Sequence, residues 1–423
     1  MKKSLFAIAA LSAIASTSYA QESSVTLYGV LDAAFATQQV TVGGGAATFP
    51  STLNVMGTPT NTAYTGNFAG MINGGISDSR WGLKGSEDLG GGRKASFTLE
   101  SGIDITSGGL NNAAASLASN SGATKNTVSA SDASALNGQL FNRGAFVSLS
   151  DETLGTIQMG RTTNPYLDVY NNYDPVQASQ ILSPFGYSGK FGGGGLTENS
   201  RLDNSLKYAS NTGPFKFVAA YKFGNVAGSN AGNGYSITAG YETAQYGVMA
   251  TYQNFTDTAH GSASSTTGQV TSTFYDSTSW GVVGKYKVTP EATVKAGYQT
   301  YHLATPSNPG VDATNTSYYG ATVAGTPATS AVDQTVNVYF VGGDYFITPK
   351  LNLAVGYYNL QFGGNNGGAS YTENMASVLL DYNLSKRTDV YTGFLYNTFS
   401  GDAITSAMST TNNIFMVGMR HKF

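Results

Sequence analysis

Residues 214–224 read Pro-Phe-Lys-Phe-Val-Ala-Ala-Tyr-Lys-Phe-Gly. Two sets of residues alternate along this stretch: Phe215, Phe217, Ala219, Tyr221 and Phe223 against Lys216, Val218, Ala220 and Lys222. A period of two puts the two sets on opposite faces of a β-strand. Aromatic residues towards both ends of the apolar face are typical of a strand that faces lipid. The stretch therefore predicts a strand in a membrane wall.

The same alternation recurs in three further segments, residues 234–242, 278–288 and 374–384. Their apolar faces carry Tyr235 and Ile237, Trp280 and Tyr286, and Val378 and Tyr382. The opposite faces carry Lys, Asp, Glu and Ser, which suits a water-filled interior. In segments 140–150 and 334–347 the pattern does not define which face meets lipid.

Sixteen such segments cover the chain after residue 20. They are residues 24–38, 77–87, 94–106, 140–150, 154–163, 200–211, 214–224, 234–244, 246–256, 277–288, 292–303, 334–347, 351–362, 374–385, 389–399 and 413–423. Short turns alternate with long connections, which are residues 39–76, 107–139, 164–199, 225–233, 257–276, 304–333, 363–373 and 400–412. This arrangement predicts an all-β fold, a transmembrane antiparallel up-and-down barrel of 16 strands. Closure of the last segment on the first leaves no strand edge unpaired in hydrocarbon.

Composition agrees with such a wall. Only 11% of residues are charged, against about 25% in a typical soluble protein. The mean hydropathy of −0.14, and the lack of any run of about 18 apolar residues, exclude a helical membrane protein. A secreted soluble β-protein is the alternative, but it would carry more charge on its polar face. The formal net charge of −3 gives no basis for nucleic-acid binding.

The first twenty residues have the features of a secretory signal peptide. Lys2 and Lys3 precede the apolar run 5–15, and Ser18-Tyr19-Ala20 offers small residues at a cleavage site. A buried N-terminal helix is the alternative. We expect residues 1–20 to be removed and residues 21–423 to form a single barrel domain.

Four motifs carry a resemblance to a known family. They are Ser24-Val-Thr-Leu-Tyr-Gly-Val-Leu-Asp32, Ser79-Arg-Trp-Gly-Leu-Lys-Gly-Ser-Glu-Asp-Leu-Gly90, Leu154-Gly-Thr-Ile-Gln-Met-Gly-Arg161 and Met416-Val-Gly-Met-Arg-His-Lys-Phe423. The chain resembles the Gram-negative general-diffusion porins, most closely their β-proteobacterial branch. The resemblance implies an outer-membrane homotrimer in contact with lipid and lipopolysaccharide, inserted by the barrel-assembly machinery. It also implies a third loop, about residues 164–199, folded into the lumen, and an assembly signal at Phe423.

The resemblance also implies a pore constriction. The family's strand arginines correspond here to Arg80, Arg143 and Arg201, and Lys84 shares the face of Arg80. Secondary candidates on the wall are Arg161, Asp203 and Lys207. For Arg161 alone, a salt bridge that holds loop to wall is as good an interpretation as a transport role. The other three, brought together from separate strands, would repel one another, which favours a role in transport.

The third loop departs from the family's Pro-Glu-Phe-Gly run, because Pro184-Phe185-Gly186 lacks the Glu. Its remaining acids near the constriction are Asp168 and Asp174, and Lys190 adds a positive charge. These residues predict a net positive constriction. A narrow pore with low-dielectric walls focuses such a field and draws anions.

The sequence does not support catalysis or cofactor binding. The absence of Cys excludes thiolate nucleophiles and Cys-ligated metals. Gly192–Gly195 has no Lys-Ser/Thr after it, so we interpret it as a loop hinge and not a phosphate site. The three histidines, His260, His302 and His421, lack metal-ligand spacing. We expect no catalytic residue, no cofactor and no metal.

Three functions remain. The first is a water-filled trimeric pore for small hydrophilic solutes and ions with a mild preference for anions. The second is a channel specific for a small organic or phosphorylated anion, and the third is a barrel that mainly presents adhesin-like surface loops. Gly29, Ala33 and Gly144 are expected to face outward, where small residues allow barrel walls to approach.

Overall fold

The computed structural model describes residues 24–42, 64–109, 140–186, 201–210, 213–224, 233–264, 269–304, 317–318, 321–322, 333–364, 367–402 and 411–423. The expected signal peptide and Lys190 lie outside these residues. Within them, regular structure is almost entirely β, and no helix has the length and apolar character needed to cross a membrane.

Seventeen strands in the described part of the chain form one sheet. They are β1 (Ser24–Val42), β2 (Tyr64–Asn73), β3 (Arg80–Gly90), β4 (Arg93–Gly102), β5 (Gly144–Asp151), β6 (Gly155–Thr163), β7 (Arg201–Ser210), β8 (Phe215–Lys222), β9 (Gly234–Glu242), β10 (Tyr246–Ser264), β11 (Gln269–Lys287), β12 (Ala292–Ala304), β15 (Asp333–Thr348), β16 (Leu351–Phe362), β17 (Tyr371–Asn383), β18 (Thr388–Ser400) and β19 (Thr411–Lys422). A small hairpin, β13 (Ser317–Tyr318) with β14 (Ala321–Thr322), and one helix, α4 (Pro165–Tyr173), complete the elements.

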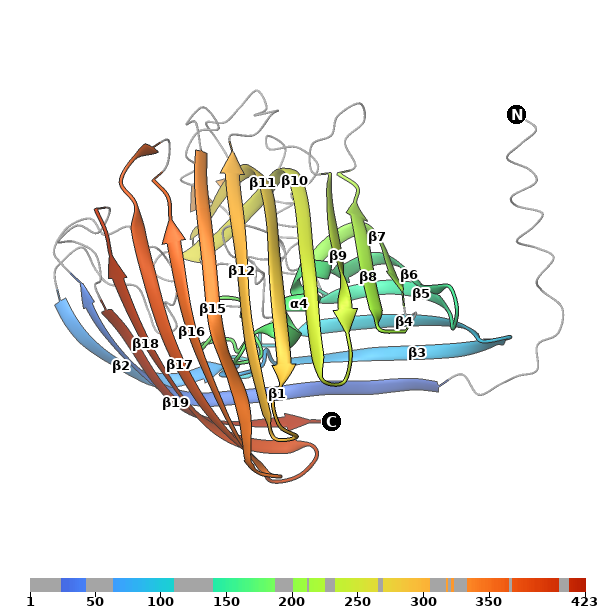
Figure 1. The fold of residues 1–423 in the computed structure, drawn as a ribbon, viewed down its shortest axis with the longest axis horizontal. Coiled ribbons are helices and arrows are strands. Elements are labelled where there is room, and N and C mark those ends of the chain that lie inside the picture. The colour runs from blue at the N-terminus through green and yellow to red at the C-terminus, as the bar shows by residue number, and fades with distance from the viewer. Residues whose placement is uncertain are drawn as a thin grey trace.

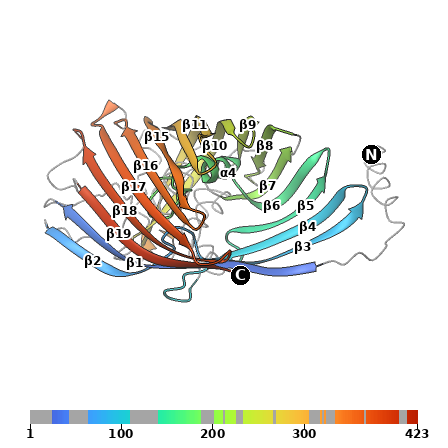
Figure 2. The ribbon, with the colours of Figure 1, turned by 60° about the horizontal axis from the view of Figure 1, so that its bottom comes forward.

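The sheet closes into a barrel because β1 pairs on both of its edges. One edge pairs antiparallel with β19, from Val30↔Lys422 to Thr41↔Thr411. The other edge pairs with β3 along its first half and with β2 along its second half. Since β2 and β3 share one place in the wall, the described strands fill sixteen positions, as the sequence predicted. Figures 1 and 2 show β1 and β19 side by side near the C-terminus.

Strand ends differ from the sequence prediction at two places. Strand β2 lies inside the predicted long connection 39–76, and β10 and β11 extend into the predicted connection 257–276. Both stretches are rich in Thr, Ser and Gly, a composition that resembles a loop. Ladder hydrogen bonds use only backbone groups, so the strands continue where side-chain alternation fades.

Side-chain burial confirms the predicted faces. In β8 to β11, the exposed face carries Phe215, Phe217, Ile237 and Trp280, while Ser236 and Ser279 are buried. The burial pattern also defines the two ambiguous segments: Val147 and Leu149 of β5 are exposed, whereas Val336, Val338 and Phe340 of β15 are buried. Large apolar side chains outside and polar ones inside are the arrangement that a lipid solvent selects.

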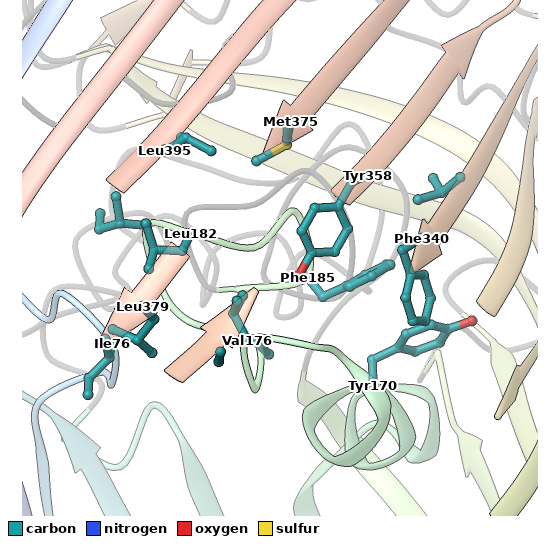
Figure 3. Packing of buried hydrophobic residues seen from close by; sticks show 14 of the residues in the cluster. Ile76, Tyr170, Val176, Leu182, Phe185, Phe340, Tyr358, Met375, Leu379 and Leu395 are labelled. Carbon is teal, nitrogen blue, oxygen red and sulfur yellow. The ribbon is translucent and has the colours of Figure 1, made fainter. Parts of the chain in front are cut away.

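The buried face of the wall is not polar throughout, which corrects one expectation. From β12 to β19 it carries a cluster that includes Tyr301, Phe340, Tyr358 and Leu395. Side chains of residues 164–186, a segment that contains α4, pack against this cluster (Figure 3). The ring of Phe185 lies 4.6 Å from that of Tyr170 and 5.3 Å from that of Phe340, between centroids. Strand β15 was ambiguous because both of its faces are apolar.

Candidate functional site

A tight turn between β2 and β3 places the first site residues. The Asp32 carboxylate on β1 accepts hydrogen bonds from the backbone N–H groups of Gly75 (3.2 Å), Ile76 (3.2 Å) and Ser77 (2.7 Å). Tyr391 donates a further hydrogen bond to the same carboxylate. Because buried backbone groups need partners, Asp32 fixes the turn that leads directly into Arg80, the first residue of β3.

The structure brings the three predicted arginines together. Arg143, one residue before β5, donates from Nε to Glu100 Oε1 at 2.8 Å and from Nη1 to Asp78. Arg80 Nε lies 3.6 Å from the other oxygen of Glu100, Oε2. Arg201, the first residue of β7, donates from Nε to the backbone oxygen of Arg143 at 2.8 Å. We call Arg80, Arg143 and Arg201 the arginine cluster.

Two acids that sequence reasoning missed hold the arginine cluster together. Glu100 lies near the C-terminal end of β4, opposite Gly82 of β3 and Gly144. It accepts from Arg143 and also from the hydroxyl of Tyr28 at 3.0 Å. Asp78 sits two residues before Arg80, whose Nη1 donates to the Asp78 carbonyl at 2.8 Å. The sequence signal that could have found Glu100 is the alternation along β4, which puts Glu100 on the polar face.

The pairing of Gly144 with Glu100 also corrects an expectation about the outward face. Opposite residues of an antiparallel pair share a face. A Cβ on Gly144 would meet the Glu100 side chain at 3.9 Å. Gly144 therefore lies on the buried face, and the expectation that it faces outward was wrong.

Lys84 is linked to the arginine cluster through an aromatic ring. Its Nζ lies 5.0 Å from the ring centroid of Tyr28, whose hydroxyl binds Glu100. The Lys84 side chain is exposed, whereas Arg143 is only 10% exposed. A cation over a tyrosine ring is stabilised by about 0.5–1 kcal/mol at an exposed site.

Arg161 stands beside the cluster in an ion pair of the wall. Its Nη1 donates to Asp203, and its Nε donates to the backbone oxygen of Asn142 at 2.7 Å. Both charged side chains are nearly buried, at 7% and 12% exposed. This geometry supports the structural interpretation of Arg161, because its charge is bound to a neighbouring strand.

The predicted loop acids lie at two separate places. Asp168, in the first turn of α4, binds the Nζ of Lys207. The same Nζ also donates hydrogen bonds to the backbone oxygen of Thr163 at 3.1 Å and to its side-chain Oγ1 at 2.8 Å. The ion pair joins the helix to β7 and cancels the charge of Lys207.

Asp174, just after α4, does not face the arginines. Its carboxylate is fully buried and accepts from Tyr358 Oη (2.6 Å) and from the backbone N–H groups of Val176 (3.1 Å) and Ala178 (2.6 Å). Burial raises the pKa of Asp174 to about 6, although the Tyr358 hydrogen bond opposes this shift. Its expected role as the acid opposite the arginines is therefore corrected: Asp174 fixes the turn of the segment.

The charge count around the cluster follows from these contacts. Arg80, Arg143, Arg161 and Arg201 are set against the three carboxylates of Asp78, Glu100 and Asp203, so these seven groups together carry one net positive charge, and Lys84 and Lys222 are further cations beside them. The acids beside the arginine cluster are Asp78 and Glu100 and not the predicted Asp168 and Asp174. Among the described residues, no group of three His, Asp or Glu side chains could hold a metal ion.

Phe423 takes part in barrel closure. Its backbone N–H donates to Gly29 O at 3.1 Å, and Gly29 N–H donates to Phe423 O at 3.0 Å. The phenyl ring lies against Gly29, where a Cβ would come within 2.3 Å of its Cζ. Glycine at this position of β1 is what allows the ring to cover the seam between β1 and β19.

Comparisons with known proteins define the class. A Gram-negative porin family model matches residues 7–402, so the chain belongs to this family. Membership in this family agrees with the expectation of a channel and not an enzyme. Membership also confirms an outer-membrane location in a Gram-negative bacterium.

Individual relatives agree with the β-proteobacterial resemblance. An outer membrane porin protein of Bordetella pertussis is 32% identical over 224 residues, 53% of this chain and 48% of the relative. The chain spans about half the length of the curated relatives it matches. An anion-selective porin from Comamonas acidovorans has a similar fold, with a TM-score of 0.60, 20% identity, and coverage of 95% of this chain and 100% of that one. OmpT of Vibrio cholerae, in a trimer form, matches with a TM-score of 0.58, 15% identity, and coverage of 95% and 100%.

Proposed function

We propose that the chain forms a water-filled pore for passive diffusion of small hydrophilic solutes and ions, with a mild preference for anions. The observation that carries this proposal is the arginine cluster on the buried face of a closed barrel, with one net positive charge. A charge in a narrow low-dielectric passage acts on ions far more strongly than one in open solvent. The Comamonas porin of similar fold is described as anion-selective.

The 164–186 segment is the proposed constriction, as the described part of the expected loop 164–199. Its support is a set of contacts with strands far apart in the wall. Tyr173 Oη donates to Glu242 of β9 at 2.7 Å, Asn164 Nδ2 to Gln253 of β10 at 3.0 Å, and Ser377 of β17 to Leu182 O at 2.5 Å. A segment that crosses the interior reaches all three of these strands, β9, β10 and β17. This crossing narrows the passage beside the arginines.

The proposed assembly is a homotrimer in contact with outer-membrane lipid and lipopolysaccharide. A trimer form is stated for the Vibrio OmpT of similar fold. Ala33 lies between exposed Leu31 and Phe35 on the outward face of β1 and supplies a small side chain for a close wall contact, whereas Gly29 on the same face is covered by Phe423. Insertion by the barrel-assembly machinery, with Phe423 as its signal, and a single domain over residues 21–423 complete this proposal.

Swelling of liposomes tests the pore directly. Liposomes that contain the folded protein should swell in isotonic solutions of small sugars, at a rate that falls as sugar size rises. Protein-free liposomes are the control. If swelling matches that of the protein-free liposomes for the smallest sugar, the chain is not a diffusion pore.

A further inference from the structure

Three tyrosines of α4 share one face of the helix. Tyr166, Tyr170 and Tyr173 are spaced by four and three residues, and side chains at these spacings are neighbours on a helix surface. All three are at most 1% exposed. The hydroxyl of Tyr166 donates a hydrogen bond to Gln299 of β12. This face therefore joins α4 to the wall of the barrel.

The other two tyrosines end over glycines of the wall. A Cβ on Gly281 of β11 would come 2.6 Å from Tyr170 Oη, and a Cβ on Gly247 of β10 would overlap Tyr173 Oη. The match is closer at Gly247, because the two nearest atoms to its Cβ both belong to Tyr173. At Gly281, the wall atom Gln299 Cβ would also lie only 2.8 Å away. Tyr173 can take its place because position 247 has no side chain.

Tyr173 is held in this place by a charged residue on each side of Gly247. Its Oη donates to Glu242 of β9 at 2.7 Å. Lys285 of β11 has its Nζ 4.6 Å from the Tyr173 ring centroid and 3.0 Å from Glu242 Oε1. In the strand register, Gly247 is directly opposite both Glu242 and Lys285. We call Glu242, Gly247 and Lys285 the Tyr173 seat.

We propose that the Tyr173 seat determines the largest solute that the pore admits, with Gly247 as its positioning residue. Packed interiors have low compressibility and transmit strain, so a displacement of Tyr173 moves the end of α4 with it. The wall lies on one side of α4 and the passage on the other. Any side chain at position 247 therefore moves the helix into the passage. This inference rests on the proposed pore and assigns its size limit to wall residues outside the arginine cluster.

Swelling of liposomes in two sugars tests the Tyr173 seat. The ratio of the rate in sucrose to the rate in arabinose is independent of the amount of folded protein, because both rates scale with the number of open pores. Gly247→Ala should lower this ratio several-fold, since its Cβ displaces Tyr173 from β10. Gly284→Ala is the matched control and should keep the wild-type ratio. It adds the same group to β11, opposite exposed Val248, where the nearest atom lies 3.8 Å away.

A substitution of Tyr173 separates the seat from a general disturbance of β10. Tyr173→Phe removes the hydroxyl that the new Cβ would overlap and leaves the ring carbon Cζ at 3.2 Å. The double variant Gly247→Ala/Tyr173→Phe should therefore keep nearly the ratio of Tyr173→Phe alone, because contacting residues are not additive. A disturbance of β10 that does not act through Tyr173 would lower the ratio equally in both backgrounds.

Each outcome decides the proposal. An unchanged or higher ratio in Gly247→Ala overturns the Tyr173 seat as the size limit and leaves the pore standing. An equal fall in both backgrounds also overturns it. Wild-type liposomes that swell in neither sugar overturn the pore and the seat together. If Gly247→Ala liposomes fail to swell in arabinose, Gly281→Ala, which crowds Tyr170, carries the same expectation and the same contradiction.

Discussion

The two sides of the barrel wall use their buried faces differently. From β3 to β8 this face carries ion pairs and the arginine cluster, whereas from β12 to β19 it carries Tyr301, Phe340, Tyr358 and Leu395. The 164–186 segment packs its aromatic residues against the second side and is joined to the first by the ion pair of Asp168 with Lys207. The comparison indicates a division of labour: the apolar cluster of the second side anchors the segment, and the arginine cluster of the first side sets the preference between anions and cations.

The largest effect is expected from the aromatic packing that holds the 164–186 segment against the second side of the wall. Phe185→Ala removes a fully buried ring that packs on Tyr170, Phe340 and Tyr358. Truncation of a buried Phe costs about 3–5 kcal/mol, so the 164–186 segment should become open to protease in the folded protein. Phe217→Ala, the same truncation on the exposed face of β8, is the control and should leave the segment protected. Equal cleavage of the 164–186 segment in both variants would contradict the anchoring role of Phe185.

The next largest effect is expected in how the stability of the 164–186 segment depends on pH. Because the folded pKa of Asp174 is raised to about 6 from 3.8, its stabilising contribution is complete below pH 4 and is lost as pH rises to 6. A shift of two units corresponds to about 3 kcal/mol. Lys295, which donates to Asp174 O at 3.1 Å and faces Asp344 at 3.5 Å, is the nearest cation.

Hydrogen exchange of the 164–186 segment measures this dependence. After correction for the intrinsic effect of pH on exchange, protection should be greater at pH 4 than at pH 7. Asp174→Asn should flatten the difference, since an amide does not titrate. A wild-type protection that stays constant or rises with pH would contradict the assignment.

A smaller effect is expected on the charged side. Glu100→Gln removes the carboxylate that Arg80, Arg143 and Tyr28 share, and raises the local net charge from one to two. Permeability of anions relative to cations should rise several-fold, because a charge a few ångströms away interacts by about 4 kcal/mol at an effective dielectric of 20 before screening by salt. Reversal potential in a KCl gradient measures this. Glu291→Gln, in an exposed turn, is the control. An equal shift of the reversal potential in both variants would show that Glu100 has no specific influence on ion selectivity.

Much of this organisation could be predicted from sequence because it is periodic. Alternation in residues such as Phe215 and Ile237 defines the lipid-facing side, and repetition defines sixteen wall positions. The joint location of Arg80, Arg143 and Arg201 also follows, through motifs. These features depend on local pattern or on family likeness, and both are visible along the chain.

The rest depends on register and on contacts between distant residues. Glu100 joins Arg143 only because β4 and β5 pair at Glu100↔Gly144, and alternation alone does not give that register. Asp174 is an acid in a loop, and nothing nearby in sequence shows that Tyr358 covers it. Strand β2 was missed because its pairing with β1 uses backbone groups, in a stretch whose side chains resemble a loop.

The central claim is that the arginine cluster sets ion selectivity. The decisive variant combines Arg80→Ser, Arg143→Ser and Arg201→Ser, which changes the local balance from one net positive to two net negative charges. Its control removes three cations from exposed turns outside the cluster: Lys350→Ser, Lys386→Ser and Arg387→Ser. Both variants lose the same total charge, so any difference between them reports position.

The most direct measurement is the reversal potential of the wild type and both triple variants in planar bilayers, under a KCl gradient. The account predicts that the wild type and the turn variant share a mildly anion-selective value, and that the cluster variant shifts towards the potassium equilibrium potential. A cluster variant with the reversal potential of the wild type would contradict the claim that Arg80, Arg143 and Arg201 set selectivity.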